Sequence, residues 1–283
     1  MIRFIKENLI LFIVFLSTCL VWIPLIMIIS GSFMGAVEIN DNVGTIFNDS
    51  HTFVKWNVIP QYPTLKPYIE LLLDTPQFFV MFWNSCKQVF PILLGQLVIA
   101  VPAAWSFAHF NFKYKKAVFA LYIILMILPF QVTMVSSYLI LNKLQLMDTH
   151  WALIIPNIFS TLPVFIMAKF FKGIPSSLIE AAKVDGASEF IIFVKIAVPL
   201  GKPGILSALV LGFLEYWNNI EQPLTFLKDK SLWPLSLYLS DIASDNLGVS
   251  LAASVIMLMP ALLIFLAGQK YLEQGIIASG MKD

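Results

Sequence analysis

Charged side chains are scarce in this sequence. They make up only 12% of the 283 residues, whereas 59% of the residues are hydrophobic. Soluble domains usually carry about 25% charged residues, so a water-exposed globule of this composition would leave large apolar areas wet. This excludes an ordinary soluble enzyme, a secreted domain and a disordered chain. The formal net charge of +1 also gives no bulk attraction to nucleic acid. The composition predicts that a lipid bilayer surrounds most of the chain.

Cysteine and histidine are scarce as well. Cys19 and Cys86 cannot build a disulfide scaffold, and His51, His109 and His150 are too scattered to predict a metal site. The sequence contains no G-x-x-x-x-G-K-[ST] loop that could cradle ATP phosphates and no G-x-S-x-G nucleophile elbow. We therefore predict that the chain is not an enzyme and has no catalytic residue, no metal site and no cofactor of its own.

Long apolar stretches dominate what remains. About 20 residues at ~1.5 Å rise span the ~30 Å hydrocarbon core of a bilayer. Six stretches meet this length, at residues 9–30, 89–110, 117–141, 151–171, 204–224 and 247–268. Prolines in or beside them are expected to kink the helices, because buried neighbours can satisfy the freed backbone groups. The predicted fold class is all-α, a polytopic membrane protein with six transmembrane helices in a single domain over residues 1–283.

The distribution of basic residues predicts an orientation. With the N-terminus inside, twelve of the 18 lysine and arginine residues lie on the cytoplasmic side and six lie outside. The positive-inside rule favours this arrangement. We expect a multi-pass protein of the cell membrane with both termini cytoplasmic, an extracytoplasmic loop at residues 31–77 and a cytoplasmic loop at residues 172–202. The cytoplasmic set is Arg3, Lys6, Lys113, Lys115, Lys116, Lys169, Lys172, Lys183, Lys195, Lys202, Lys270 and Lys282.

The cytoplasmic loop at residues 172–202 predicts two short helices. Ser177 and Glu180 have the spacing of a capping box at the start of the first helix, and Gly186 suits a left-handed residue at its end. Pro199 is expected to stop the second helix. The first helix is predicted to place Leu178, Ala181 and Ala182 on one face. The second is predicted to carry an apolar stripe of Phe190, Phe193, Val194, Ala197 and Val198.

The same loop carries a recognisable motif. The sequence Glu180-Ala181-Ala182 is followed after three residues by Gly186, after nine more by Ile196 and after one more by Val198-Pro199. This pattern resembles the EAA loop of binding-protein-dependent ABC importer permeases, with Val198 in place of a leucine. The neighbouring residues resemble the shorter subunit of carbohydrate importers of the maltose-permease type. They are Phe170, Phe171, Lys172, Ile174, Pro175, Asp185, Ala187, Phe193, Leu200, Pro203 and residues 279–282.

The resemblance implies a role for this loop. In that family the EAA helix is a coupling helix that docks on a cytoplasmic ATPase, so Glu180, Ala181, Ala182, Asp185 and Gly186 are expected to make or shape that contact. The implied partners are a second permease subunit forming a heterodimer, two ATPase subunits that bind ATP and Mg, and an extracytoplasmic solute-binding protein. The implied function is ATP-driven import of a sugar or oligosaccharide by alternating access.

The fifth apolar stretch is interrupted by polar residues. Glu215, Trp217, Asn218, Asn219 and Gln222 lie at or near membrane depth, where polar groups usually face a cavity or a partner. Amides bond sugar hydroxyls, and aromatic rings stack on sugar C–H faces, so this cluster is a candidate solute pathway. Two alternatives stay open: the amides can bond neighbouring helices instead, and the partner permease can hold most of the solute contacts.

Two other classes of function compete with the importer. An ion-gradient-driven secondary transporter normally has more spans, or inverted repeats around a midplane ion site. Here only Glu215 lies deep in a predicted span, and no internal repeat is evident. An intramembrane enzyme needs a catalytic constellation, which the sequence does not supply.

Overall fold

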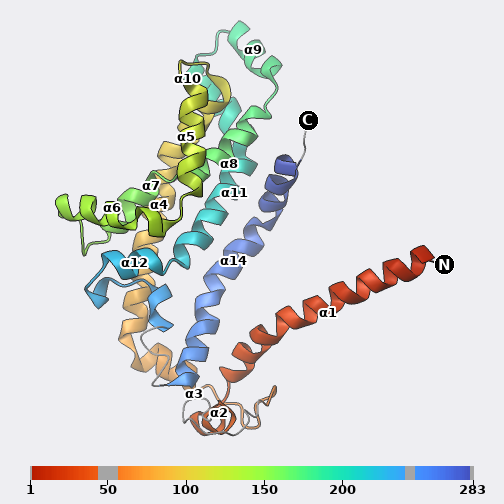
Figure 1. The fold of residues 1–283 in the computed structure, drawn as a ribbon, viewed down its shortest axis with the longest axis vertical. Helices are drawn as coiled ribbons and strands as arrows, with labels where there is room; N and C mark the ends of the chain where they lie inside the picture. Colours follow the sequence, from red (N-terminus) through yellow and green to blue (C-terminus); the bar gives the residue numbers. More distant parts are fainter. Residues whose placement is uncertain (1, 44–56, 240–245, 281–283) are drawn as a thin grey trace. The chain divides into compact units, whose positions relative to one another are not determined.

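The computed structural model describes residues 2–43, 57–239 and 246–280, and the secondary structure in these ranges is helical, without strands (Figure 1). This confirms the all-α fold class. Part of the predicted outer loop, residues 44–56, lies outside the described ranges, as do residues 240–245.

The helices follow one another with short connections. In chain order they are α1 (Ile2–Gly31), α2 (Ala36–Val43), α3 (Lys66–Ile69), the π-helix η2 (Glu70–Asp74), α4 (Pro76–His109), α5 (Lys115–Ile127), α6 (Phe130–Lys143), α7 (Trp151–Ile158), α8 (Thr161–Lys172), α9 (Ser176–Val184), α10 (Glu189–Ile192), the π-helix η3 (Phe193–Ala197), α11 (Val198–Trp217), α12 (Glu221–Phe226), the 3-10 helices η4 (Lys230–Leu232) and η5 (Leu235–Leu237), and α14 (Leu247–Gly280).

Five helical segments in the described ranges are long and apolar enough to cross a membrane. They are Asn8–Gly31, Pro76–His109, Trp151–Lys172, Glu189–Trp217 and Leu247–Glu273. Helices α5 and α6 pass the same test only as a pair, and they make a sixth segment if the bent pair is counted as one span. The chain is therefore a multi-pass membrane protein.

The predicted span at residues 117–141 is broken into two helices, because α5 and α6 meet at an angle of 101°. Leu128 has an extended backbone with φ −65° and ψ 121°, and Pro129 follows it with ψ 149°. A residue that precedes proline is pushed out of the helical region by the proline ring. The Leu128–Pro129 pair therefore breaks the helix, where the sequence analysis expected a kink.

The predicted helix at residues 204–224 has different ends in the structure. Helical backbone begins at Glu189 and ends at Trp217, and α12 starts separately at Glu221. Pro199 does not stop this helix, because it lies in the first turn of α11 directly after η3. The first turn tolerates a missing N–H, and a π-helix also departs from the i→i+4 pattern that an interior proline would disrupt.

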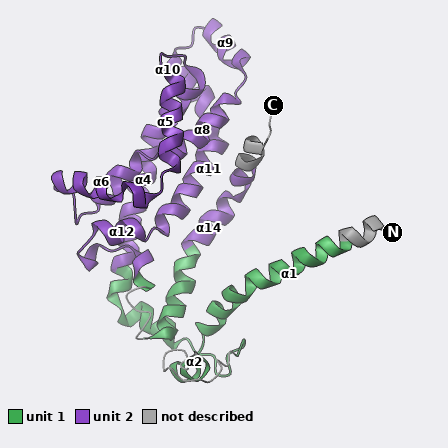
Figure 2. Cartoon of the chain, in the orientation of Figure 1, with its two compact units in different colours: residues 1–79, 238–259 green, residues 80–237, 260–283 purple. Residues whose placement is uncertain are grey.

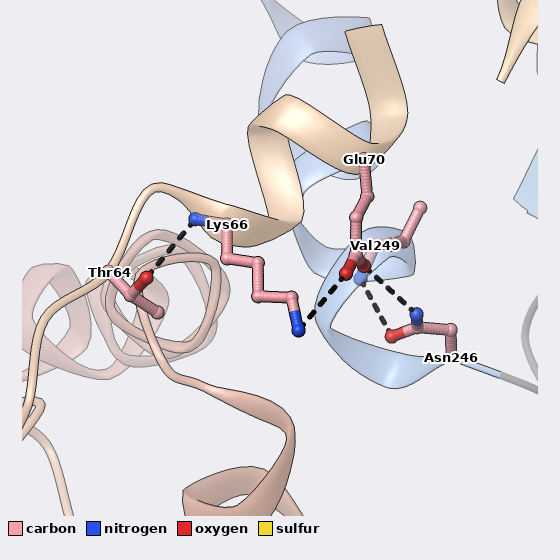
Figure 3. A network of polar contacts seen from close by, with 5 residues as sticks. All are labelled: Thr64, Lys66, Glu70, Asn246 and Val249. Atoms are coloured by element: carbon pink, nitrogen blue, oxygen red, sulfur yellow. Dashed lines mark hydrogen bonds and ion pairs between the residues drawn. The ribbon is translucent and has the colours of Figure 1, made fainter. Parts of the chain in front are cut away.

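The chain divides into two compact units, coloured separately in Figure 2. The first contains residues 1–79 and 238–259, and the second contains residues 80–237 and 260–283. In the first unit, polar contacts join the consecutive helices α3 and η2 to the residue before α14 (Figure 3). Asn246 Nδ2 donates to Glu70 Oε2 at 3.3 Å, and Lys66 Nζ lies 3.6 Å from Glu70 Oε1. Asn246 Oδ1 also accepts from the backbone of Val249, which fixes the first turn of α14.

The core of the second unit is centred on the packing of α8 against α11. Phe171 of α8 and Trp105 of α4 are both buried in this core, and their ring centroids lie 5.7 Å apart in an edge-to-face pair. Gly201 and Gly204 of α11 lie directly against the rings of Phe171 and Phe170, where a Cβ atom would overlap the aromatic carbons. Two glycines in one stripe therefore let α11 approach α8 as closely as its backbone allows.

We expect Gly201→Ala to destabilise the protein. The added methyl group forces the buried Phe171 ring to move, and overpacking of this kind costs about 1–3 kcal/mol. The measurement is thermal unfolding of the purified protein in detergent. Gly35→Ala is the matched control, because the nearest atom to its new Cβ is Thr64 Cγ2 at 3.8 Å, an ordinary contact. Equal unfolding temperatures for the two variants would contradict the close-packing argument.

Candidate functional site

Helix α9 (Ser176–Val184) carries the first candidate site, but it does not begin as predicted. Pro175 is its N-cap residue, with φ −58° and ψ 131°, and no side chain caps the helix. Ser177 therefore lies inside the first turn, where its hydroxyl is no longer in the N-cap position. The predicted capping box of Ser177 and Glu180 is wrong, because the fixed φ of Pro175 starts the helix two residues earlier.

The end of α9 confirms the prediction made for Gly186. This glycine has φ +81°, in the left-handed region. Its N–H donates to Lys183 O at 3.0 Å, and the N–H of Ala187 donates to Ala182 O at 2.9 Å. These two bonds form a Schellman motif, which satisfies the last carbonyl groups of the helix. The chain turns sharply here and leads into α10.

The two faces of α9 differ from the predicted arrangement. Ile179, which the sequence analysis did not select, is only 3% exposed and belongs to the core of the second unit. Ala182 packs against that core, whereas Leu178 and Ala181 are exposed, so the three predicted residues do not share a face. Val184 is 88% exposed. The outer surface of α9 is thus small and apolar, and it is flanked by the exposed carboxylates of Glu180 and Asp185.

The second predicted helix of this loop is the start of the long helix that includes α11. Ile192 and Ala197 are buried, whereas Phe190 is 74% exposed and Val194 is also exposed. The predicted stripe is therefore only partly right. It assumed 3.6 residues per turn, but residues 193–197 form a π-helix, whose wider turn shifts the inward face.

A second candidate site lies among polar side chains of α4, α7, α11 and α12. Gln96 of α4 is 1% exposed, and its Nε2 donates to Asn157 O and to the hydroxyl of Tyr216, both at 2.8 Å. Gln96 Oε1 is buried and has no hydrogen-bond partner among the described residues. Asn157 Nδ2 donates in turn to Gln222 Oε1 at 2.7 Å. One connected set of neutral amides and a phenol therefore links four helices.

Asn157, Tyr216 and Gln222 of this set line a cavity of about 10 Å³, which is about the space that one water molecule needs. Its lining is neutral and consists of Gln88, Val89, Ile92, Leu153, Asn157, Tyr216, Asn219, Gln222 and Pro223. Two interruptions in helical structure lie close by in sequence, at residues 159–160 and 218–220. At membrane depth, irregular backbone is tolerated where it is buried in protein or lines a cavity.

A histidine lies at one end of this region. His150 Nδ1 lies 3.1 Å from Gln88 Nε2, directly before the first turn of α7. Burial lowers the pKa of His150 below its usual value, and the positive charge of Lys87 lowers it further. Both effects favour the neutral form of the imidazole beside the neutral cavity.

The structure separates the five residues predicted for a solute pathway. Asn219 and Gln222 line the cavity, and the backbone N–H of Gln222 donates to Asn219 Oδ1 at 3.3 Å. Glu215 and Asn218 are exposed, and Asn218 Nδ2 donates to Leu214 O of its own helix at 2.8 Å. Trp217 is 4% exposed. Its ring stacks on Phe213 at 5.2 Å and meets Phe82 edge-on, so it is a packing residue in this conformation.

The sequence analysis missed Gln88, Gln96 and Asn157. A signal was present in α4, where Asn84 and Gln88 occur at i and i+4 on one helical face and Gln96 follows two turns later, about 80° further around the helix. Asn84 and Gln88 donate to backbone carbonyls at residues 231–233, which fixes the segment after α12. A polar stripe within an apolar helix predicts buried partners even before the partners are known.

Comparisons with known proteins all indicate similarity to membrane components of transport systems. The family model described as "Binding-protein-dependent transport system inner membrane component" matches residues 96–278. An arabinooligosaccharides transport system permease of Halalkalibacterium halodurans is 29% identical over 262 residues, which is 92% of this chain and 90% of that protein. A probable ABC transporter permease of Pyrococcus horikoshii is 33% identical over 229 residues, 78% of this chain and 83% of that protein.

The fold also has a close counterpart among solved structures. A chain of a bacterial ABC transporter involved in the import of the acidic polysaccharide alginate superposes with a TM-score of 0.79 at 20% identity. The match covers 95% of this chain and 96% of that one. At this identity the likeness concerns the fold alone.

We expect Gly186→Val to loosen the end of α9, whereas Gly186→Asn preserves it. No atom lies within 4 Å of the position of a new Cβ, so the cost of the substitution is backbone strain alone. That strain is about 1–2 kcal/mol for an ordinary L-residue, and asparagine tolerates the left-handed region better. Hydrogen exchange of the amides of residues 185–187 is the measurement. Equal protection in both variants would refute the role of the positive φ.

Proposed function

Because the chain belongs to the family of binding-protein-dependent transport system inner membrane components, we propose that it is the permease subunit of an importer for a neutral sugar or oligosaccharide. A separate ATPase drives alternating access through α9, and this chain does not hydrolyse ATP. Membership of this family gives no support to an ion-gradient-driven secondary transporter.

The observation that carries this proposal is the construction of α9. It is a nine-residue helix with one buried anchor, Ile179, and an outer surface of Leu178, Ala181 and Val184. Such a surface suits an apolar groove on another protein, and Glu180 and Asp185 can pair with basic residues at its edge. The sequence has no phosphate-binding loop. We infer that two ATPase subunits bind ATP and Mg and move α9.

The nature of the solute is inferred from the cavity. Its lining consists of amides, a phenol and apolar side chains, without a charged residue. Neutral donors and acceptors of this kind complement sugar hydroxyls, whereas an anionic solute would call for cations. Several relatives are named as permeases for sugars, among them arabinooligosaccharides, galactooligosaccharides and lactose. We propose that solute passes Asn157, Asn219 and Gln222 when the cavity is open.

In the conformation described here the cavity is closed to a sugar. Its volume matches one water molecule, and the bond from Asn157 to Gln222 joins α7 to α12 across it. Opening requires that bond to break, and a solute hydroxyl can replace either partner. Discontinuous helices commonly line such sites in transporters. The interruptions at residues 159–160 and 218–220 supply the backbone freedom for this movement.

The proposed assembly includes a second permease subunit and an extracytoplasmic solute-binding protein. We propose that both termini are cytoplasmic. In that orientation α9 faces the ATPase, and most lysine and arginine residues lie inside.

We expect Glu180→Lys to uncouple the importer. The reversed charge repels the basic edge of the ATPase groove, so uptake falls at least ten-fold, about 1.4 kcal/mol, while the membrane subunits still assemble. The measurement is ATP-dependent uptake of radiolabelled sugars into vesicles containing the whole complex, together with ATP hydrolysis. Asp41→Lys, which makes the same charge change at an exposed position of helix α2, is the control. Unchanged uptake by the Glu180 variant would contradict the docking role of α9.

We expect Gln222→Leu and Asn157→Leu to impair uptake without impairing assembly. Each variant removes the bond between the two amides, and interhelical bonds of this kind contribute about 0.6–1.7 kcal/mol. If the pair also binds solute, the apparent KM for solute-loaded binding protein rises. Kinetics of uptake in vesicles provide the measurement, and Thr225→Val on the same short helix is the control. An unchanged KM in both leucine variants would exclude these amides from the pathway.

A further inference from the structure

An ion pair spans the turn after α9. Lys183 Nζ lies 2.6 Å from Glu189 Oε1, and both side chains are about half-exposed. Lys183 is in the last turn of α9, and Glu189 is the first residue of α10. The two residues lie on opposite sides of the Gly186 turn. The pair therefore joins the end of α9 directly to the start of the next helix.

Helix α9 needs such a second attachment. Ile179 is its only fully buried residue, and Ala182 adds a small partly buried contact. A helix held along a single row of side chains can roll about that row. Lys183 is not part of the buried row, and it reaches α10 instead of the core. Its bond to Glu189 opposes rotation that the packing of Ile179 alone permits.

The acidic residue of the ion pair belongs to a long helical segment. Glu189 begins a continuous helical segment that runs through η3 and α11 to Trp217. Gly201 and Gly204 pack this segment tightly against Phe171 and Phe170 of α8. At its far end, the hydroxyl of Tyr216 accepts from Gln96 in the polar network. A displacement of α9 that reaches Glu189 is thus applied to a rigid element that ends beside the cavity.

Ser188 strengthens this connection. Its Oγ accepts from the backbone N–H of Ile191 at 3.4 Å and caps the first turn of α10. The cap holds the start of α10 in helical form, so Glu189 sits on a defined backbone. The chain between Asp185 and Ser188 is therefore fixed at both ends, by the Schellman motif and by this cap.

We propose that Lys183 and Glu189 are positioning residues that transmit movement of α9 to α11, and that their ion pair sets how much solute is imported per ATP hydrolysed. This inference rests on the proposed function, and it assigns a role to two residues outside the surface of α9 that meets the ATPase. The pair acts as a brace: Ile179 holds α9 in place, and the ion pair holds its orientation.

The expected effect is moderate, because half-exposed ion pairs are screened by solvent. Such pairs contribute up to about 1 kcal/mol, which corresponds to a change of up to about five-fold. We therefore expect Lys183→Glu and Glu189→Lys each to lower the amount of sugar imported per ATP by two- to five-fold. The doubly reversed variant, K183E/E189K, restores the pair with opposite polarity and recovers most of the ratio.

The experiment uses the complete complex in vesicles and measures uptake and ATP hydrolysis in the same sample. Thermal stability and co-purification of the ATPase are measured in parallel, since loss of the pair should leave both unchanged. Lys195→Glu is the matched control, because it reverses an exposed lysine in the same helical segment. Raising the ionic strength should lower the ratio in the unmodified complex and have less effect in the single variants.

Three results would overturn the inference. One is a ratio in the double variant no better than in the worse single variant. Another is loss of ATPase co-purification in the Lys183 variant alone, because Lys183 would then be a docking residue. The third is an equal loss in Lys195→Glu. A complex without any ATP-dependent uptake before substitution would instead refute the proposed function, so the two failures are distinguishable.

Discussion

The close approach of α11 to α8 is the contact on which the rest of the second unit depends. Gly201 and Gly204 admit the rings of Phe171 and Phe170 against the backbone of α11, so these helices are in close contact over about one turn. Lipid offers no hydrophobic driving force for helix association, and small residues at the interface are the usual solution. Because α8 leads into α9 and α9 leads back into α11, this contact also closes a loop around α9. Helix α9 thus projects from two helices, α8 and α11, that are packed tightly against each other.

Much of this arrangement could be predicted from the sequence, and the exceptions have identifiable physical causes. The apolar stretches located the long helices, and Gly186 was recognised as a left-handed C-cap. The 101° bend at Leu128–Pro129 could not be foreseen, because a proline in an apolar helix can kink it or break it, and neighbouring packing decides. The position of Pro199 in the first turn of α11 was missed for a related reason. A π-helix precedes it, and its wider turn is invisible to a search for a period of 3.6 residues.

In the candidate sites, the sequence pattern located the elements but did not predict which side chains contact one another. The motif located α9, but only the structure identified Ile179 as its anchor, because the side of a short helix that faces the core is set by residues distant in sequence. Trp217 was a reasonable candidate for stacking on a sugar, yet its ring stacks on Phe213. An aromatic residue near amides has the same sequence signature in both roles. The bond between Asn157 and Gln222 joins residues 65 positions apart. A single sequence does not show that two such distant residues are in contact.

The two candidate sites are mechanically related through one element. The helical segment Glu189–Trp217 has 29 residues, about 43 Å of helix at a rise of ~1.5 Å per residue. One end adjoins α9 and the other adjoins the neutral cavity. A helix packed through glycines moves as a body, so a rotation applied near Glu189 displaces Tyr216 and strains its bond to Gln96. That bond already involves a glutamine whose Oε1 lacks a partner among the described residues, which makes the network less costly to disrupt than a fully satisfied one. Under the proposed function, the cavity lies where a modest movement of α11 would exchange internal hydrogen bonds for those of a solute.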